Sequence, residues 1–138
     1  MRDLLGDIGI NEEQIEIANL ATSFCRDKSS TVTARKLIEA RTSQTPALWD
    51  EIAELGWLGI AIPEEYGGIG LSLAETVPVM EQMGRTMMSG PFLSTTLAAQ
   101  VLLMAGTEKQ KAEWLPKLTA GARATLATTE LKSSYDPA

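Results

Sequence analysis

The chain has 138 residues, of which 44% are hydrophobic and 22% charged, so it fits one globular domain with enough apolar material for a core. It has no histidine and one cysteine, Cys25, which excludes a Ser-His-Asp triad, a Cys-His pair, a zinc site built on histidine or several thiolates, and an internal disulfide. The net charge of −6 argues against binding to nucleic acid, which needs clustered lysine and arginine.

Apolar runs in the sequence are short. None approaches the roughly 20 residues that cross a bilayer. The N-terminal residues Met1, Arg2 and Asp3 do not begin a signal-peptide pattern. We therefore expect a cytoplasmic protein without a membrane span.

The first part of the chain predicts three helices. Asn11, with a glutamine three residues later, is an N-terminal capping pattern, and apolar residues at helical spacing continue this helix to about Asp27. Residues 30–41 mix β-branched residues with charges, so their helical pattern is weaker. A third helix begins with Thr45 before a proline and ends at Gly56.

The segment 56–70 is a loop rich in glycine and apolar residues. A loop this apolar is expected to be packed on the core, with Trp57 buried. Its glycines do not form a phosphate-binding loop, because the GK[ST] ending is missing and no strand precedes it. We interpret them as a structural turn.

Two capping patterns and a proline predict three helices in the second half of the chain. The first begins at Ser72 and runs to about Met88. The second begins at Pro91 and is so apolar that we expect it at the centre of the domain. The third begins at Thr107 and ends at Gly121. Its expected buried residues are Trp114, Leu115 and Leu118.

The segment 123–129 alternates apolar and polar residues, as a strand does. A lone strand cannot pair its own backbone groups, so residues 123–138 are expected to begin a β domain that pairs with another chain or a further domain. The expected organisation is an all-α bundle of five or six helices over residues 1–122, followed by this strand.

Two blocks of sequence resemble the acyl-CoA dehydrogenase family. The first is LGWLGIAIPEEYGGIGLS at 55–72, and the second runs from AGTEKQK at 105–111 through WLPKL at 114–118 to LATTE at 126–130. They stand in the family's order, and the resemblance extends over residues 11–130. It implies the family's N-terminal helical domain, which is followed by a middle β domain and a C-terminal four-helix domain, with FAD held between the domains.

The resemblance also implies a reaction. In the family, a glutamate removes the α proton of an acyl-CoA thioester while the β hydride passes to FAD. That glutamate usually lies in the C-terminal domain, so no catalytic residue is nominated here and the chain alone is expected to be inactive. The implied partners are an acyl-CoA substrate and the missing β and C-terminal helical domains or another subunit, in a homo- or hetero-oligomer of lipid metabolism.

Site residues follow from the resemblance, position by position. Leu126, Thr128 and Thr129 fall where the family contacts or approaches the flavin ring. Leu93 and Leu97 fall where the acyl cavity is lined, and ordinary core packing is the alternative for both. No metal ligand is expected.

The chain departs from the family after Glu130. Where the family continues with Pro-Gly-Ala-Gly-Ser-Asp, residues 131–136 read LKSSYD. Glycines at such positions let the backbone approach a cofactor closely. Their loss favours an alternative function, a noncatalytic partner or interaction subunit that keeps the helical fold and binds no FAD.

Overall fold

The computed structural model describes residues 11–42 and 45–127, and these residues form six α-helices, three short 3₁₀-helices and no strand. The α-helices are α2 (Glu12–Lys28), α3 (Thr31–Glu39), α4 (Pro46–Glu54), α5 (Val77–Arg85), α6 (Phe92–Ala105) and α7 (Glu108–Thr119). The 3₁₀-helices are η1 (Trp57–Gly59), η2 (Glu64–Tyr66) and η3 (Leu73–Thr76). The all-α fold expected from the sequence is confirmed.

Side-chain caps begin the helices where the sequence predicts them. Asn11 and Thr107 each form a capping box with a glutamine three residues later, and Thr45 accepts a hydrogen bond from the backbone N–H of Leu48. The helix expected from Ser72 starts as η3 and becomes α-helical only at Val77. The proline at 78 therefore lies in the first turn of α5, where its missing N–H breaks no helical hydrogen bond.

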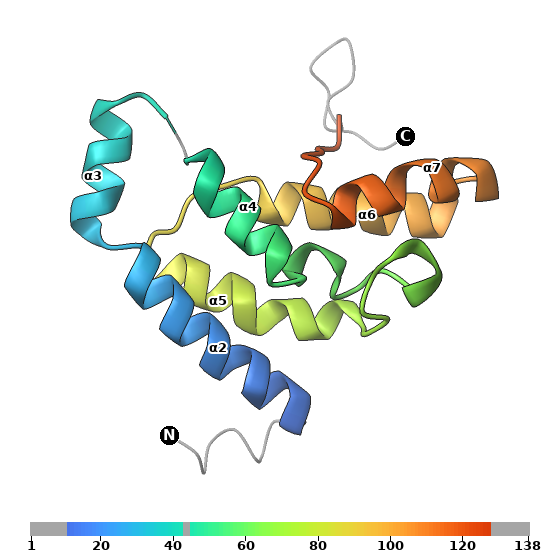
Figure 1. Ribbon diagram of the computed structural model, residues 1–138, viewed down its shortest axis with the longest axis horizontal. Coiled ribbons are helices and arrows are strands. Elements are labelled where there is room, and N and C mark those ends of the chain that lie inside the picture. Colours follow the sequence, from blue (N-terminus) through green and yellow to red (C-terminus); the bar gives the residue numbers. More distant parts are fainter. Residues whose placement is uncertain (1–10, 43–44, 128–138) are drawn as a thin grey trace, which may run out of the picture.

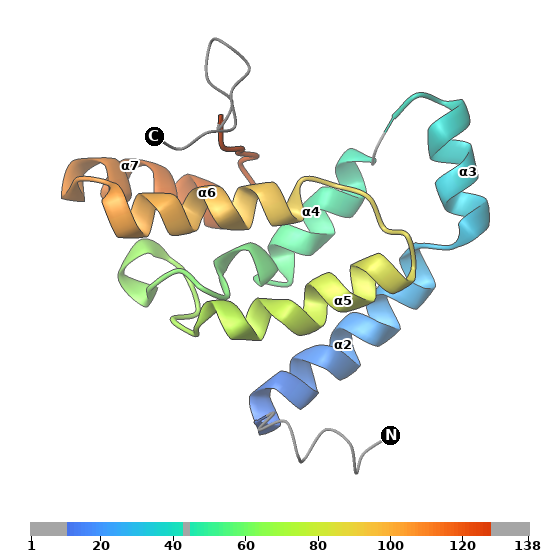
Figure 2. The same cartoon turned by 180° about the vertical axis from the view of Figure 1, so that it is seen from behind.

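The helices form two packed groups with α4 between them (Figures 1 and 2). In one group α2 packs along α5, and in the other α6 packs along α7. The helix α3 stands at the edge of the molecule and buries only Ala34. No helix in the described ranges is long and apolar enough to cross a membrane.

The core has two clusters. The larger joins α2, α4, α5 and η1 and contains Trp49, Ile52, Trp57 and Val79. The smaller lies under α6 and α7. Its buried residues are Ile62, Ala99, Leu115 and Leu118.

The loop between α4 and η3 is packed on the core, as expected. Trp57 is 3% exposed, and the backbone N–H groups of Ile69 and Leu71 donate to the carbonyls of Gly59 and Ile60. A Cβ on Gly68 would overlap the Ile62 carbonyl, so this close approach of two backbone segments requires glycine. The glycines thus form a structural turn, as the sequence indicated.

Two expectations about burial are wrong. The helix α6 is not central, because one of its faces is exposed, with Met104 at 86%. Trp114 is not core either, and 46% of it is exposed. Helical periodicity shows which residues share a face, but the number of neighbouring helices decides how much of the surface is covered.

The expected strand is not formed over residues 122–127, which have no regular secondary structure. An extended segment needs a second strand to pair its N–H and C=O groups, and the described residues offer none. Positions 128–138 lie outside the described residues, so the assignment of 123–138 to a β domain stays a prediction.

Candidate functional site

An apolar stripe runs along the exposed face of α6. Its residues are Leu93, Leu97, Val101 and Met104, exposed by 54%, 40%, 45% and 86%. Their spacing of four, four and three residues places them on one side of the helix. Exposed apolar side chains are common singly, but an aligned stripe marks a surface that binds something.

A groove of about 300 Å³ lies beside the C-terminal half of this stripe. It is formed by α6, α7 and the segment after α7. Its lining residues are Ala98, Val101, Leu102, Trp114, Leu118, Ala124, Thr125 and Leu126. None of these residues is charged, and Thr125 brings the one side-chain hydroxyl among them, so the groove suits an apolar ligand surface.

The turn after α7 directs the chain into this groove. Gly121 has φ +104°, and the N–H groups of Gly121 and Ala122 donate to the carbonyls of Leu118 and Lys117. This is the Schellman ending, in which glycine adopts a backbone conformation that a side chain would strain. The turn carries residues 122–126 back onto α6.

The structure brings some of the predicted site residues together. Leu126 lines the groove, while Leu93 and Leu97 lie on the same stripe as Val101 but do not line it. Thr128 and Thr129 lie outside the described residues. Leu93 and Leu97 are 54% and 40% exposed, so in this chain they are not part of the hydrophobic core, which was the alternative.

Sequence reasoning missed Trp114, which it placed in the core. The indole is part of the groove wall, and the Lys117 ammonium lies 4.3 Å from the ring centroid. Such a cation over an aromatic face is attracted by the ring quadrupole. The sequence feature that could have indicated this exposed position is a tryptophan three residues before a lysine in a helix rich in charged residues.

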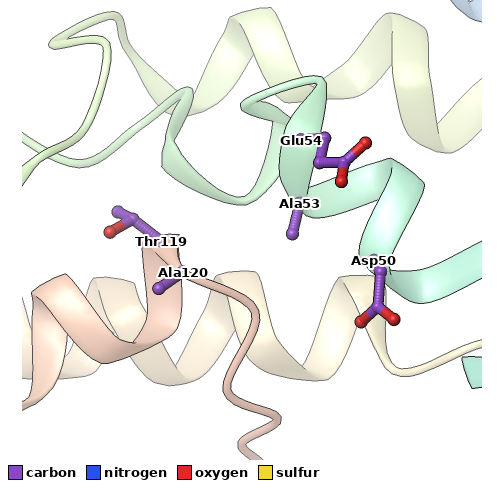
Figure 3. Close-up of a pocket in the computed structure, with 5 residues that line it drawn as sticks. All are labelled: Asp50, Ala53, Glu54, Thr119 and Ala120. Carbon is purple, nitrogen blue, oxygen red and sulfur yellow. The ribbon is translucent and has the colours of Figure 1, made fainter. Parts of the chain in front are cut away.

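A second hollow, also about 300 Å³, lies between α4 and the end of α7 (Figure 3). Asp50, Ala53 and Glu54 line it from α4. Thr119, the last residue of α7, and Ala120 after it line the opposite side. Two carboxylates and the C-terminal end of a helix, where carbonyls carry partial negative charge, make this hollow repel phosphate groups. It is therefore a poor site for a nucleotide.

The perturbed titratable groups serve the fold. Burial raises the pKa of Cys25, which disfavours the reactive thiolate form. The pKa of Glu75 is lowered, chiefly by its hydrogen bond from Ser72 in the cap of η3. Within the described ranges, no three acidic or cysteine residues are grouped as metal ligands. The lining of the groove contains no acid–base group of its own.

Comparison with known proteins identifies the family to which this fold belongs. The family model for the acyl-CoA dehydrogenase N-terminal domain matches residues 11–122. The chain therefore belongs to the acyl-CoA dehydrogenase N-terminal domain family, which confirms the resemblance read from the two sequence blocks.

Individual relatives agree with this family. A (2S)-methylsuccinyl-CoA dehydrogenase of Cereibacter sphaeroides is 46% identical over 74 residues, which are 52% of this chain and 14% of the relative. The acyl-CoA dehydrogenase IpdE2 of Mycolicibacterium smegmatis is 31% identical over 115 residues, 83% of this chain and 36% of the relative.

Solved structures show the same fold. An acyl-CoA dehydrogenase from Bacillus anthracis, complexed with FAD, matches with a TM-score of 0.73 and 30% identity, over 91% of this chain and 22% of that one. A variant of the Tcur3481-Tcur3483 steroid ACAD matches with a TM-score of 0.74 and 33% identity, over 87% of this chain and 33% of that one. This chain thus spans only about a third or less of the proteins it resembles.

Proposed function

We propose that this chain forms the N-terminal helical wall of an FAD-dependent acyl-CoA dehydrogenase, which converts an acyl-CoA to its α,β-unsaturated thioester. In this proposal, Leu93 and Leu97 contact the acyl chain, and Leu126, Thr128 and Thr129 contact the flavin ring. The remaining walls come from a β domain and a C-terminal helical domain, in the same polypeptide or in another subunit.

One observation carries the proposal: the apolar stripe of α6 continues into a groove that Leu126 lines. An acyl chain and a flavin ring must meet at adjacent apolar surfaces for hydride transfer. The stripe and groove supply such surfaces side by side, from α6, α7 and the segment after α7. Their exposure in this chain supports a role in which other domains complete the site.

The residues of the groove fit the ring of FAD. The Trp114 and Leu126 side chains would hold a flat aromatic ring, and the Thr125 hydroxyl would offer a hydrogen bond to it without adding charge. The diphosphate would have to be held elsewhere, because no charged residue lines the groove. When bound, FAD would accept the hydride from the β carbon.

Proton abstraction is assigned to a group outside this chain. Glu75 is 6% exposed, its carboxylate is held by the η3 cap and the start of α2, and it does not line the groove. Oxidation of acyl-CoA with an artificial electron acceptor should stay at background for the purified chain. Turnover would contradict the assignment of the base to another domain.

The second candidate is a noncatalytic partner or interaction subunit. The sequence at 131–136, which lacks the family's glycines, favours it. Flavin absorbance separates the two candidates when the chain is combined with its missing domains. The proposed enzyme would retain stoichiometric FAD, whereas an interaction subunit would be colourless.

A chimeric enzyme tests the proposed function. Residues 11–126 would replace the matching segment of the mycobacterial relative, and flavin content and kcat/KM would be measured with a short-chain and a long-chain acyl-CoA. Leu97→Trp should lower kcat/KM for the long chain by about tenfold more than for the short chain, because the indole would occupy the acyl space. Leu20→Trp on the exposed face of α2 is the control.

Two outcomes would contradict the proposal. One is an active chimera whose chain-length preference is unchanged by Leu97→Trp. The other is a folded chimera that retains no FAD.

In a protein that also contains residues 127–138, Thr129→Val should speed FAD loss several-fold, since one neutral hydrogen bond contributes about 0.5–1.5 kcal/mol.

A further inference from the structure

The segment after α7 is irregular, yet two side chains from distant helices hold it. The Trp49 indole N–H of α4 donates to the Gly121 carbonyl at 2.6 Å. The Thr95 hydroxyl of α6 accepts from the Ala124 N–H at 3.2 Å and lies 3.4 Å from the Ala124 carbonyl, to which it donates. Both side chains are 2% exposed, while Gly121 and Ala124 are partly exposed, so these bonds are partly buried.

The contact of Thr95 with Ala124 takes the place of strand pairing. In a sheet, a residue exchanges N–H and C=O bonds with the backbone of its neighbour. Here one hydroxyl provides both the acceptor and the donor for Ala124. The Arg123 guanidinium also lies over the Trp49 ring, 5.6 Å from its centroid, so successive residues after the turn are tied to the helices.

Thr96 shows that this geometry is particular to Thr95. The two threonines are adjacent on α6 and both buried. The Thr96 hydroxyl donates to the Phe92 carbonyl of its own helix, at 2.9 Å, as threonine commonly does in helices. Of these two threonines, Thr95 alone uses its hydroxyl to hold another segment.

We propose that Thr95 and Trp49 are positioning residues that set the register of residues 121–124 on the helices and thereby place Thr125 and Leu126 at the groove. Ala124 is itself part of the groove wall, so a shift of its backbone changes the shape of the groove directly. That the groove receives a flavin or acyl chain rests on the proposed function. The positioning itself requires no ligand.

The test is NMR on this chain, with Thr95→Val and Thr96→Val as a matched pair. Both changes keep the shape of the side chain and remove one buried hydroxyl. Thr95→Val should speed hydrogen exchange of the Ala124 amide by about five- to tenfold and move the Trp114 indole resonance. Thr96→Val should change neither, and Thr95→Ser, which keeps the hydroxyl, should restore both.

Trp49→Phe tests the second anchor, since it keeps a ring and removes the N–H. It should also speed exchange at Ala124. The Trp57 indole resonance reports on the main core and should stay in place in the threonine variants, which shows that the chain remains folded. Trp49 belongs to the same cluster, so for Trp49→Phe the spread of the backbone amide resonances shows this instead.

Three results would overturn the proposal. The first is unchanged exchange at Ala124 in Thr95→Val. The second is equal acceleration by Thr95→Val and Thr96→Val, which would indicate general destabilisation. The third is faster exchange without movement of the Trp114 resonance, which would separate the contact from the groove. The chimera reports on the proposed function independently of all three.

Discussion

Trp57 is the residue that joins the loop after α4 to the larger core cluster. Its ring meets Phe24 of α2 edge-on, with the centroids 5.1 Å apart and the planes at 75°. Edge-to-face pairs of this kind are favourable beyond the area they bury. The loop therefore depends on a helix that lies more than thirty residues earlier in the chain.

Trp57→Ala should lower the free energy of unfolding by about 3–5 kcal/mol, because it leaves a large cavity beneath the loop. Urea denaturation of wild type and variant would measure the loss. Trp114→Ala is the control, since Trp114 is 46% exposed and its removal opens no enclosed cavity. Equal losses in the two variants would contradict the view that the loop is held by burial.

Glu75 links two helix starts. One carboxylate oxygen accepts from the Ser72 N–H at 2.9 Å and from the Ser72 hydroxyl, and the other accepts from the Gln14 side-chain amide at 3.2 Å. These donors stabilise the charged form and hold the pKa of Glu75 below its ordinary value of 4.5, and the Ser72 hydrogen bond is the largest cause.

A lowered pKa makes stability depend on pH in one direction. The unfolded chain takes up the proton at a higher pH than the folded chain does, so the stabilisation by Glu75 is present above its unfolded value of 4.5. It is lost as the pH falls through the folded value. Urea midpoints from about pH 6 to about pH 3 should fall less steeply in Glu75→Gln than in wild type. Parallel curves would refute this role.

Among the elements, the loop 56–70 shows most clearly how backbone contact limits the sequence. Gly68 lies against the carbonyl of Ile62, and a Cβ there would overlap backbone that cannot move aside. By contrast, a Cβ on Gly84 in α5 would meet nothing within 4 Å. The two glycines therefore differ in purpose: Gly68 follows another glycine in a turn, whereas Gly84 stands between Met83 and Arg85 in a helix.

Gly68→Ala should destabilise the chain by at least about 2 kcal/mol, because the loop must move off the core. Gly84→Ala should stabilise it by about 0.5–1 kcal/mol, since alanine loses less conformational entropy in a helix. Thermal unfolding of the two variants would compare them. A loss from Gly84→Ala as large as that from Gly68→Ala would show that the loop is not specially constrained.

The helix α6 illustrates a different point about elements. It is apolar on all sides, yet only one side is covered, by α7 and the loop. The buried side carries Thr95, Ala98 and Ala99, which are small enough for close packing. The larger residues of the stripe face outward. The helix thus has an apolar surface on both sides, of which one is covered in this chain.

On the scale of the whole molecule, the uncovered side of α6 is an exposed apolar surface. Its stripe and groove lie next to each other, so apolar surface is continuous there. The helix α3 also exposes apolar residues, Val32 at 60% and Ile38 at 72%, but these are separated by a turn and a half of helix and line no groove.

The chain should self-associate and bind an apolar fluorescent dye through the α6 stripe. Replacing Leu93 and Leu97 by lysine should reduce dye fluorescence about twofold or more and shift sedimentation toward the monomer. Replacing Val32 and Ile38 by lysine is the control and should have less effect. A strict monomer that binds no dye, before any substitution, would contradict the prediction.

The sequence by itself determined the family, the helices and most of their beginnings, because caps such as Asn11 and Thr107 act within three residues and apolar spacing acts within two turns. It also predicted burial of Trp57 and a structural role for the glycines of the loop. The tertiary structure alone decided the exposure of Trp114 and of the α6 stripe, and the absence of strand pairing in residues 122–127. It also revealed the contact of Thr95 with Ala124. These depend on which surfaces of distant segments meet, and local patterns carry no information about that.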